Sequence, residues 1–69
     1  MAFEDKRLRA ALSRAEGLEK KDGVKPYVPG VEALIKGMLH DLKRGKPVDV
    51  DYAEGRVKAL ERAAESRTS

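Results

Sequence analysis

Six apolar residues in the middle of the chain recur with a spacing that a helix brings to one side. Counted from Val31, they fall at offsets 0, 3, 4, 7, 8 and 11, which follows the α-helical period of about 3.6 residues. Pro29 suits the first helical turn, and Gly45 is an ordinary stop signal. The pattern predicts a helix over residues 29–44, with an apolar stripe wide enough to contact two neighbours.

Two further segments carry helical spacing. Apolar residues at steps of three and four predict helices over residues 4–21 and 52–65, and a tail at 66–69 that frays. Charged residues make up 39% of the chain and aromatic residues 4%, which suits helices with exposed faces better than a sheet. We therefore expect an all-α fold: a small three-helix domain over residues 1–69, in which the second and third helices form a central hairpin.

The two joints between these helices have different predicted shapes. Two prolines in the first joint disfavour helical geometry before them, which predicts a short extended connector over residues 24–28. In the second joint, Asp51 precedes Glu54 by three residues, the spacing of a capping box at a helix start. The alternative is a calcium loop beginning at Asp49. That register places Leu60 where the loop needs its closing glutamate, so we expect a cap and no metal site.

Patterns typical of catalysis or cofactor binding are missing from the sequence. There is no cysteine, which excludes disulfides and thiolate metal sites, and no serine or cysteine nucleophile accompanies the one histidine, His40. The glycines form no phosphate-binding loop. No apolar run approaches the ~20 residues that span a bilayer, and the N-terminal segment is charged. We expect a cytoplasmic, non-enzymatic protein without a cofactor.

A chain this short is marginally stable alone, because it buries only roughly 60% of the surface that its unfolded state exposes. Without disulfides or a metal, a partner is the remaining source of stability. We therefore expect a protein partner or self-association. The predicted contact residues are apolar residues of the second and third helices: Leu34, Ile35, Met38, Leu39, Leu42, Val57 and Leu60.

A small nucleic-acid-binding module is the rival function. Its candidate contacts are Lys43, Arg44 and Lys46, the densest group of basic residues in the chain. The same residues also complement the negative end of the predicted second helix, which is the reading we prefer. The net charge of +3 permits nucleic-acid binding but does not require it.

The predicted N-terminal helix has a basic edge beside its apolar seam. When Leu8 and Ala15 are placed at heptad a positions, Arg7 and Arg14 fall at g positions. In a parallel pair of identical helices, Arg14 would lie against Glu19 of the second chain. The alternative is a solvated helix whose charge pattern has no partner.

The second half of the chain, LIKGMLHDLKRGKPVDVDYAEGRVKALE, resembles the C-terminal segment of small bacterial type II antitoxins. The shared pattern is a helix ending in an acidic residue and a glycine, a short turn with valine and aspartate, and a second helix. The matching positions are Gly37, Asp41, Gly45, Val48, Asp49 and Arg56. This resemblance implies a regulatory protein that wraps a toxin. The chain departs from the family at its N-terminus, where such antitoxins usually carry a DNA-binding unit. The hairpin also resembles small helical secretion chaperones, which implies an adaptor.

Overall fold

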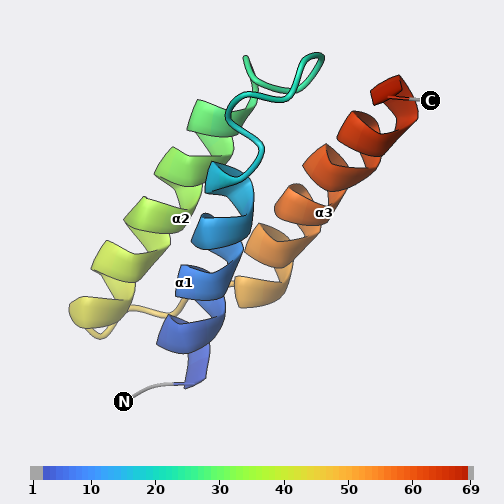
Figure 1. Cartoon of the computed structure of the whole chain (residues 1–69). Helices are drawn as coiled ribbons and strands as arrows, with labels where there is room; N and C mark the ends of the chain where they lie inside the picture. Colours follow the sequence, from blue (N-terminus) through green and yellow to red (C-terminus); the bar gives the residue numbers. More distant parts are fainter. Residues whose placement is uncertain (1–2, 69) are drawn as a thin grey trace.

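The computed structural model describes residues 3–68, with side chains from Phe3 to Ser66. The chain forms three helices: α1 (Phe3–Glu16), α2 (Val28–Lys43) and α3 (Val50–Thr68). They are arranged up, down and up, so that α1 and α3 run in the same direction and α2 runs against both (Figure 1). The bundle is elongated, with extents of 42 × 17 × 15 Å. The predicted all-α, three-helix fold is confirmed, and the described residues contain no strand.

Small aliphatic side chains fill the space between the helices. Each helix contributes at least one large side chain without exposed surface, among them Leu8 from α1, Ile35 from α2 and Val57 from α3. Val24, in the first joint, is only 1% exposed and closes the core at that end. The remaining members of the buried cluster are Ala11, Ala15, Val28, Val31, Val50, Ala53, Leu60 and Ala64.

α1 is the helix that packs extensively against both of the others. It packs most extensively against α2 and also packs against α3, whereas the α2–α3 pair makes the least extensive contact. The sequence had placed the centre of the core between the second and third helices. The buried face of α1 contains Ala11 and Ala15, whose short side chains let both neighbouring helices approach closely.

α1 ends at Glu16, earlier than the predicted end at residue 21. The N–H groups of Leu18 and Glu19 donate to carbonyls three residues back, so the α-helix gives way to tight turns. Gly17 stands where this change occurs, and glycine weakens a helix interior by about 1 kcal/mol relative to alanine. The heptad pattern therefore stops before Glu19, which lies in the turns after the helix.

The first joint is a run of turns, so the prediction of an extended connector over residues 24–28 is wrong. Gly23 takes a φ of +89°, and the N–H of Tyr27 donates to the carbonyl of Val24 at 2.8 Å. The chain turns back at this point because Val24 is packed into the core. Burial of this side chain outweighs the local preference that the prolines impose.

The end of α2 matches the predicted stop signal. Gly45 has a φ of +79°, its N–H donates to the carbonyl of Leu42 at 3.1 Å, and the N–H of Lys46 donates to Asp41 at 2.9 Å. These two bonds form a Schellman motif, in which a left-handed glycine satisfies the last carbonyls of the helix.

α3 begins two residues earlier than predicted, and the capping residue is Asp49 rather than Asp51. The N–H of Tyr52 donates to Oδ1 of Asp49 at 3.0 Å, the bond that an N-cap side chain accepts. Val50 is 5% exposed, so it enters the core from the first helical position. Half-buried Val48 packs against the core just before the cap, as in a hydrophobic staple.

The C-terminal end of α3 also extends further than predicted. The helix continues to Thr68, so residues 66–68 of the expected frayed tail are helical, and residue 69 lies outside the described residues. Within the described part of the chain, no helix combines the length and the apolar character that crossing a lipid bilayer requires.

Candidate interaction surfaces

The apolar residues predicted to contact a partner divide into two groups. Three of them pack inside the core and are at most 8% exposed: Ile35, Val57 and Leu60. Four of them remain half-buried on α2: Leu34, Met38, Leu39 and Leu42. The first group offers no surface to a partner in this fold, so its assignment as contact surface is corrected. Periodicity identifies the apolar face of a helix, but it does not show which of its residues the chain's own helices cover.

The half-buried residues lie on different edges of α2. Leu39 lines a groove together with Arg9, so it lies on the edge that faces α1. Leu34 and Met38 are one helical turn apart on the other side of the buried stripe, toward α3. Of the four residues, Leu34 is the one that does not pack against the core cluster.

An uncharged strip surrounds Leu34 on the outer side of α2. Gly30, Ala33 and Gly37 are exposed, and the space beside both glycines is open. We call Gly30, Ala33, Leu34, Gly37 and Met38 the α2 strip. Because 39% of the chain is charged, this strip stands out as a surface where a partner can approach without desolvating a charge.

Arginines of α1 bind acidic residues of α3 at two places one heptad apart. Nε of Arg7 donates to Glu54 at 3.0 Å, and Nε of Arg14 donates to Glu61 at 3.1 Å. A second guanidinium nitrogen of each arginine binds the other carboxylate oxygen, so both pairs are bidentate. These hydrogen bonds lower the pKa of Glu54 and of Glu61. The basic edge that we considered for a second chain is therefore satisfied inside this one.

Asp51 belongs to the same ion-pair system. Its Oδ1 accepts a hydrogen bond from Arg7 at 2.8 Å, and the guanidinium of Arg7 also lies 5.7 Å from the centre of the Phe3 ring. The carboxylate of Asp49 accepts the hydrogen bond that caps α3. Within residues 3–66, no group of three or more His, Asp or Glu side chains is placed to hold a metal ion.

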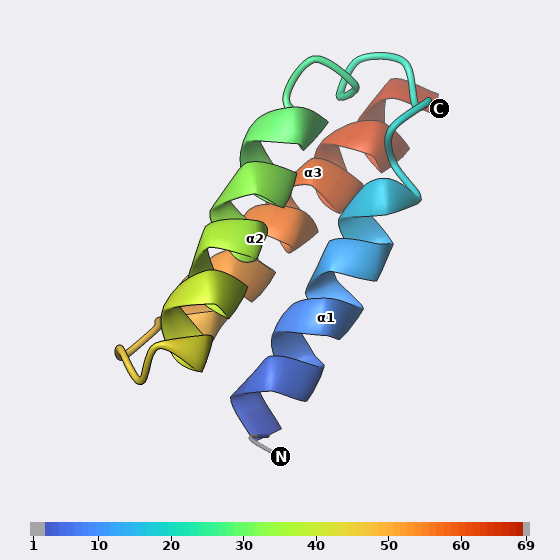
Figure 2. The same ribbon diagram turned by 90° about the vertical axis from the view of Figure 1, so that its left-hand side faces the viewer.

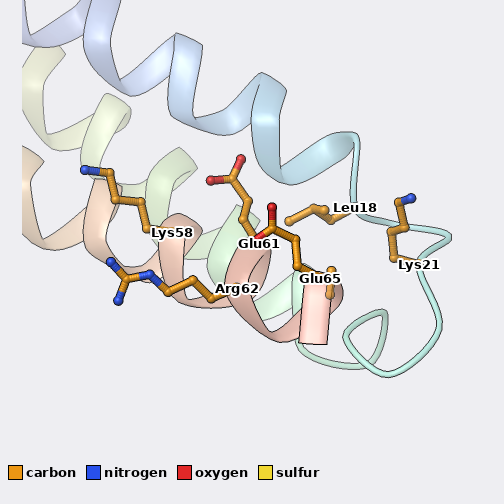
Figure 3. Close-up of a pocket in the computed structure, with 7 residues that line it drawn as sticks. Leu18, Lys21, Lys58, Glu61, Arg62 and Glu65 are labelled. Atoms are coloured by element: carbon orange, nitrogen blue, oxygen red, sulfur yellow. The ribbon is translucent and has the colours of Figure 1, made fainter. Parts of the chain in front are cut away.

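A groove of about 490 Å³ opens between the first joint and the C-terminal half of α3. Figure 3 shows Glu61 directed toward α1, and Lys58 is close enough to help lower the pKa of the Glu61 carboxyl. Leu18 supplies an apolar wall from the first joint. Both basic and acidic side chains line the groove, and none of the predicted partner-contact residues is among them.

Acidic residues meet at one end of the surface that α1 and α2 form together with the turns after α1, which we call the α1–α2 groove. Glu32 of α2 lies beside Glu19, and Glu16 is close enough to act on its charge. Oε2 of Glu32 is buried and accepts no hydrogen bond. A protonated carboxyl can donate to its neighbour, so the hydrogen bond with Glu19 raises the pKa of Glu32, and burial and repulsion act in the same direction.

Basic residues gather at the other end of the same groove. Arg9 from α1 and Lys36, His40 and Lys43 from α2 surround Leu39 in a hollow of about 310 Å³. Of the three residues predicted to contact nucleic acid, Lys43 lines this hollow, and the other two are exposed just beyond α2: Arg44 and Lys46. The sequence did not reveal the contribution of Arg9, because that residue comes from a different helix.

Replacing Glu32 by glutamine will raise the free energy of unfolding at neutral pH. The pKa of Glu32 in the fold lies above its ordinary value of 4.5, so the folded state binds a proton more tightly than the unfolded chain. In the wild type, this contribution to stability is lost as the pH rises from about 4.5 through the raised pKa. Glutamine also removes the repulsion from Glu19 and Glu16, while Lys36 on the next turn loses an attraction.

The measurement is urea denaturation followed by circular dichroism, at a series of pH values on both sides of 4.5. The stability gained by Glu32→Gln should grow as the pH rises. Glu61→Gln should behave in the opposite way: it should cost stability at neutral pH, and this cost should shrink as the pH falls, because the pKa of Glu61 is lowered. A gain in Glu32→Gln that did not change with pH would contradict the expected ionisation.

Comparison of the chain with protein-family models, with curated protein sequences and with solved structures finds no match.

Proposed function

We propose that the protein is a small, non-enzymatic regulatory or adaptor protein that binds a larger protein through the α2 strip. The observation that carries this proposal is the position of Leu34. This leucine is half-buried without packing against the core, in the middle of an uncharged surface. A large apolar side chain in such a place gains most by burial against another molecule, at about 25 cal/mol per Å² of apolar surface.

The shape of the α2 strip favours a helix as the contacting element of the partner. Gly30, Ala33 and Gly37 leave the backbone of α2 open to close approach, and Leu34 and Met38 stand at the edge of this shallow surface. An amphipathic helix that lies along such a surface inserts apolar side chains at intervals of three and four residues. The partner is therefore proposed to present an apolar helical face.

The proposal also covers two expectations drawn from the sequence: an antitoxin-, inhibitor- or chaperone-like role and a cytoplasmic location. An antitoxin, an inhibitor and a secretion chaperone all act by covering part of a larger protein, and the α2 strip lies in the segment that resembles antitoxins. A cytoplasmic location is part of the same proposal. Membrane insertion is not, since no described helix has the length and apolar character for it.

Placing two charges on the α2 strip should abolish partner binding while leaving the fold intact. In the double variant Leu34→Glu with Gly37→Glu, both changes lie outside the core cluster. The partner is first captured from the native cells with the full wild-type chain and identified. Titration calorimetry with the purified partner then measures the affinity, and we expect the dissociation constant to rise roughly thirtyfold or more, the effect of losing an interface hot spot.

The matched control is Ala10→Glu with Ser13→Glu, which adds the same charges at exposed positions of α1. The control should bind like the wild type. If both double variants bind equally well, the α2 strip is not the contact surface. Thermal melting of each variant separates loss of binding from loss of fold.

Salt dependence distinguishes this function from nucleic-acid binding. Apolar docking should change little as salt increases. Binding to DNA through Lys43, Arg44 and Lys46 would instead give a plot of log K against log salt with a slope of about −2.7 for three phosphate contacts. A slope of that size, lost when Lys43 and Lys46 are replaced by glutamine, would favour the nucleic-acid function.

A further inference from the structure

We propose that the α1–α2 groove is a self-complementary surface on which a second copy of this chain docks in an antiparallel orientation. This surface is separate from the α2 strip, which lies on the other side of the buried stripe of α2. The dimer proposal and the proposed binding of a larger protein can therefore be tested independently, and either can be wrong without the other.

Charged residues are arranged differently on the two sides of α1: unlike charges meet on the α3 side, and like charges meet on the α2 side. In the α1–α3 groove, Arg7 faces Glu54 and Arg14 faces Glu61, so unlike charges meet across the helix pair. In the α1–α2 groove, Glu19 and Glu32 are neighbours at one end, Arg9 and Lys43 line the hollow at the other, and Lys36 lies between them, one turn from Glu32. Like charges placed together destabilise a fold unless another group compensates them.

Few of these groove charges find a partner inside the chain. Arg9 is bound to Asp5 at 3.0 Å. Among the described residues, Lys36, Lys43 and Glu32 form no ion pair, and Glu32 has a buried oxygen without a hydrogen bond. The groove thus has an acidic end and a basic end, and each is only partly neutralised within the chain: Asp5 pairs with Arg9, and Lys36 attracts Glu32 without forming an ion pair.

A two-fold axis perpendicular to the helices would supply the missing counter-charges. Glu32 and Lys43 are eleven residues apart on one edge of α2, which corresponds to about 16 Å along the helix. When a second copy is turned end for end, Glu32 of each chain lies opposite Lys43 of the other. Such an interface is isologous, because each contact occurs twice. The same rotation brings Glu19, in the turns after α1, toward the end of the groove that holds Arg9 of the other chain.

The middle of the groove combines a basic and an apolar side chain, because Lys36 lines the same hollow as Leu39. Leu39 of α2 and Leu12 of α1 are half-buried side chains that pack against the core cluster from this side. Figure 2 presents this face of the molecule, with α1 and α2 side by side and α3 behind them. Leu39 lies less than two residues from the midpoint between Glu32 and Lys43, so the two-fold axis would bring it close to Leu39 of the second copy.

Sedimentation of the full wild-type chain from micromolar to millimolar concentration tests the dimer directly. We expect a monomer–dimer equilibrium that weakens as salt increases, because charge pairs hold the two ends of the interface. The basic-end variant, Arg9→Glu with Lys43→Glu, should raise the dissociation constant of the dimer roughly tenfold or more. The acidic-end variant, Glu19→Lys with Glu32→Lys, should do the same, because like charges then meet at every contact.

Mixing the two variants gives the sharpest result. The acidic groove of one variant fits the basic groove of the other along its whole length, so a 1:1 heterodimer should form although neither variant dimerises alone. The control Lys58→Glu with Arg62→Glu changes the charge in the same direction at two α3 residues that line the groove beside the first joint, outside the proposed interface, and should dimerise like the wild type. Circular dichroism of each variant confirms that it is folded.

Disulfide formation tests whether Leu39 lies at the two-fold axis. The chain has no cysteine, so a single introduced thiol can bond only to its copy. Leu39→Cys should form a covalent dimer under mild oxidation, while Ala59→Cys, at an exposed position on α3, should remain monomeric at the same concentration. A wild-type chain that stays monomeric at millimolar concentration would overturn the proposal. A mixture of the two charge variants that forms no heterodimer would also overturn it. Binding of DNA, and not of a second copy, at this groove would overturn it as well.

Discussion

Replacing Ile35 by alanine will lower the free energy of unfolding by about 2–5 kcal/mol, the range for truncating a fully buried aliphatic side chain. Ile35 has no exposed surface and lies among core residues of all three helices. A chain of 69 residues has a total stability of only roughly 3–10 kcal/mol, which makes this loss a large fraction of the whole.

Chemical denaturation followed by circular dichroism measures the effect, and three variants on the same helix serve for comparison. Ile35→Val should cost about 0.5–1.5 kcal/mol, because it removes a single methylene group. Lys36→Ala, at the next and exposed position, should stay within roughly 0.5 kcal/mol. Leu34→Ala should cost less than Ile35→Ala, since Leu34 does not pack against the core. Equal losses in Ile35→Ala and Leu34→Ala would show that the core is centred elsewhere on α2.

Helical periodicity carried enough information to predict the fold class and the middle of each helix. The predicted helix over 29–44 corresponds to α2 at Val28–Lys43, since a continuous apolar stripe and a glycine stop signal act within one segment. The same local signals overestimated α1. Its apolar series continues to Leu18, but that residue reaches the core from a turn and not from a helix.

The sequence distinguished the residues of the partner surface from the residues of the core only in part. Ile35 and Leu34 are adjacent members of one apolar series, and periodicity alone treats them alike. Their difference in the structure depends on where α1 and α3 lie against α2, which is a property of the whole bundle. The charged grooves were hidden for the same reason: Arg9 and Lys43, or Arg14 and Glu61, come together only when distant helices pack.

The position of the cap shows how a distant contact can decide between two equivalent local patterns. Asp49 and Asp51 are both suited to the N-cap, and the glutamate at 54 favoured Asp51 by the capping-box spacing. In the structure, Arg7 binds both Asp51 and Glu54 from 44 and 47 residues away. Val50 enters the core, and the helix therefore starts before Asp51.

Replacing Asp49 by alanine will destabilise the protein by about 0.5–2 kcal/mol, because the N–H of Tyr52 then loses the acceptor that caps α3. Asp49→Asn and Asp49→Ser should be nearly silent, since both side chains can accept the same hydrogen bond. Thermal melting of the three variants measures the difference. For a domain of this size, each kcal/mol corresponds to a shift of roughly 4–8 °C in Tm.

Asp51→Ala separates the cap from the ion pair. Its loss should be smaller than that of Asp49→Ala and should disappear at high salt, because the Asp51 side chain is 88% exposed and salt screens its attraction to Arg7. The cost of removing the cap should persist at high salt, since a local hydrogen bond to a backbone N–H depends less on ionic strength. Calcium, magnesium and chelator should leave every melting curve unchanged. If a divalent cation raised the Tm of the wild type but not of Asp49→Asn, the two aspartates would be metal ligands and the assignment of Asp49 as a cap would be wrong.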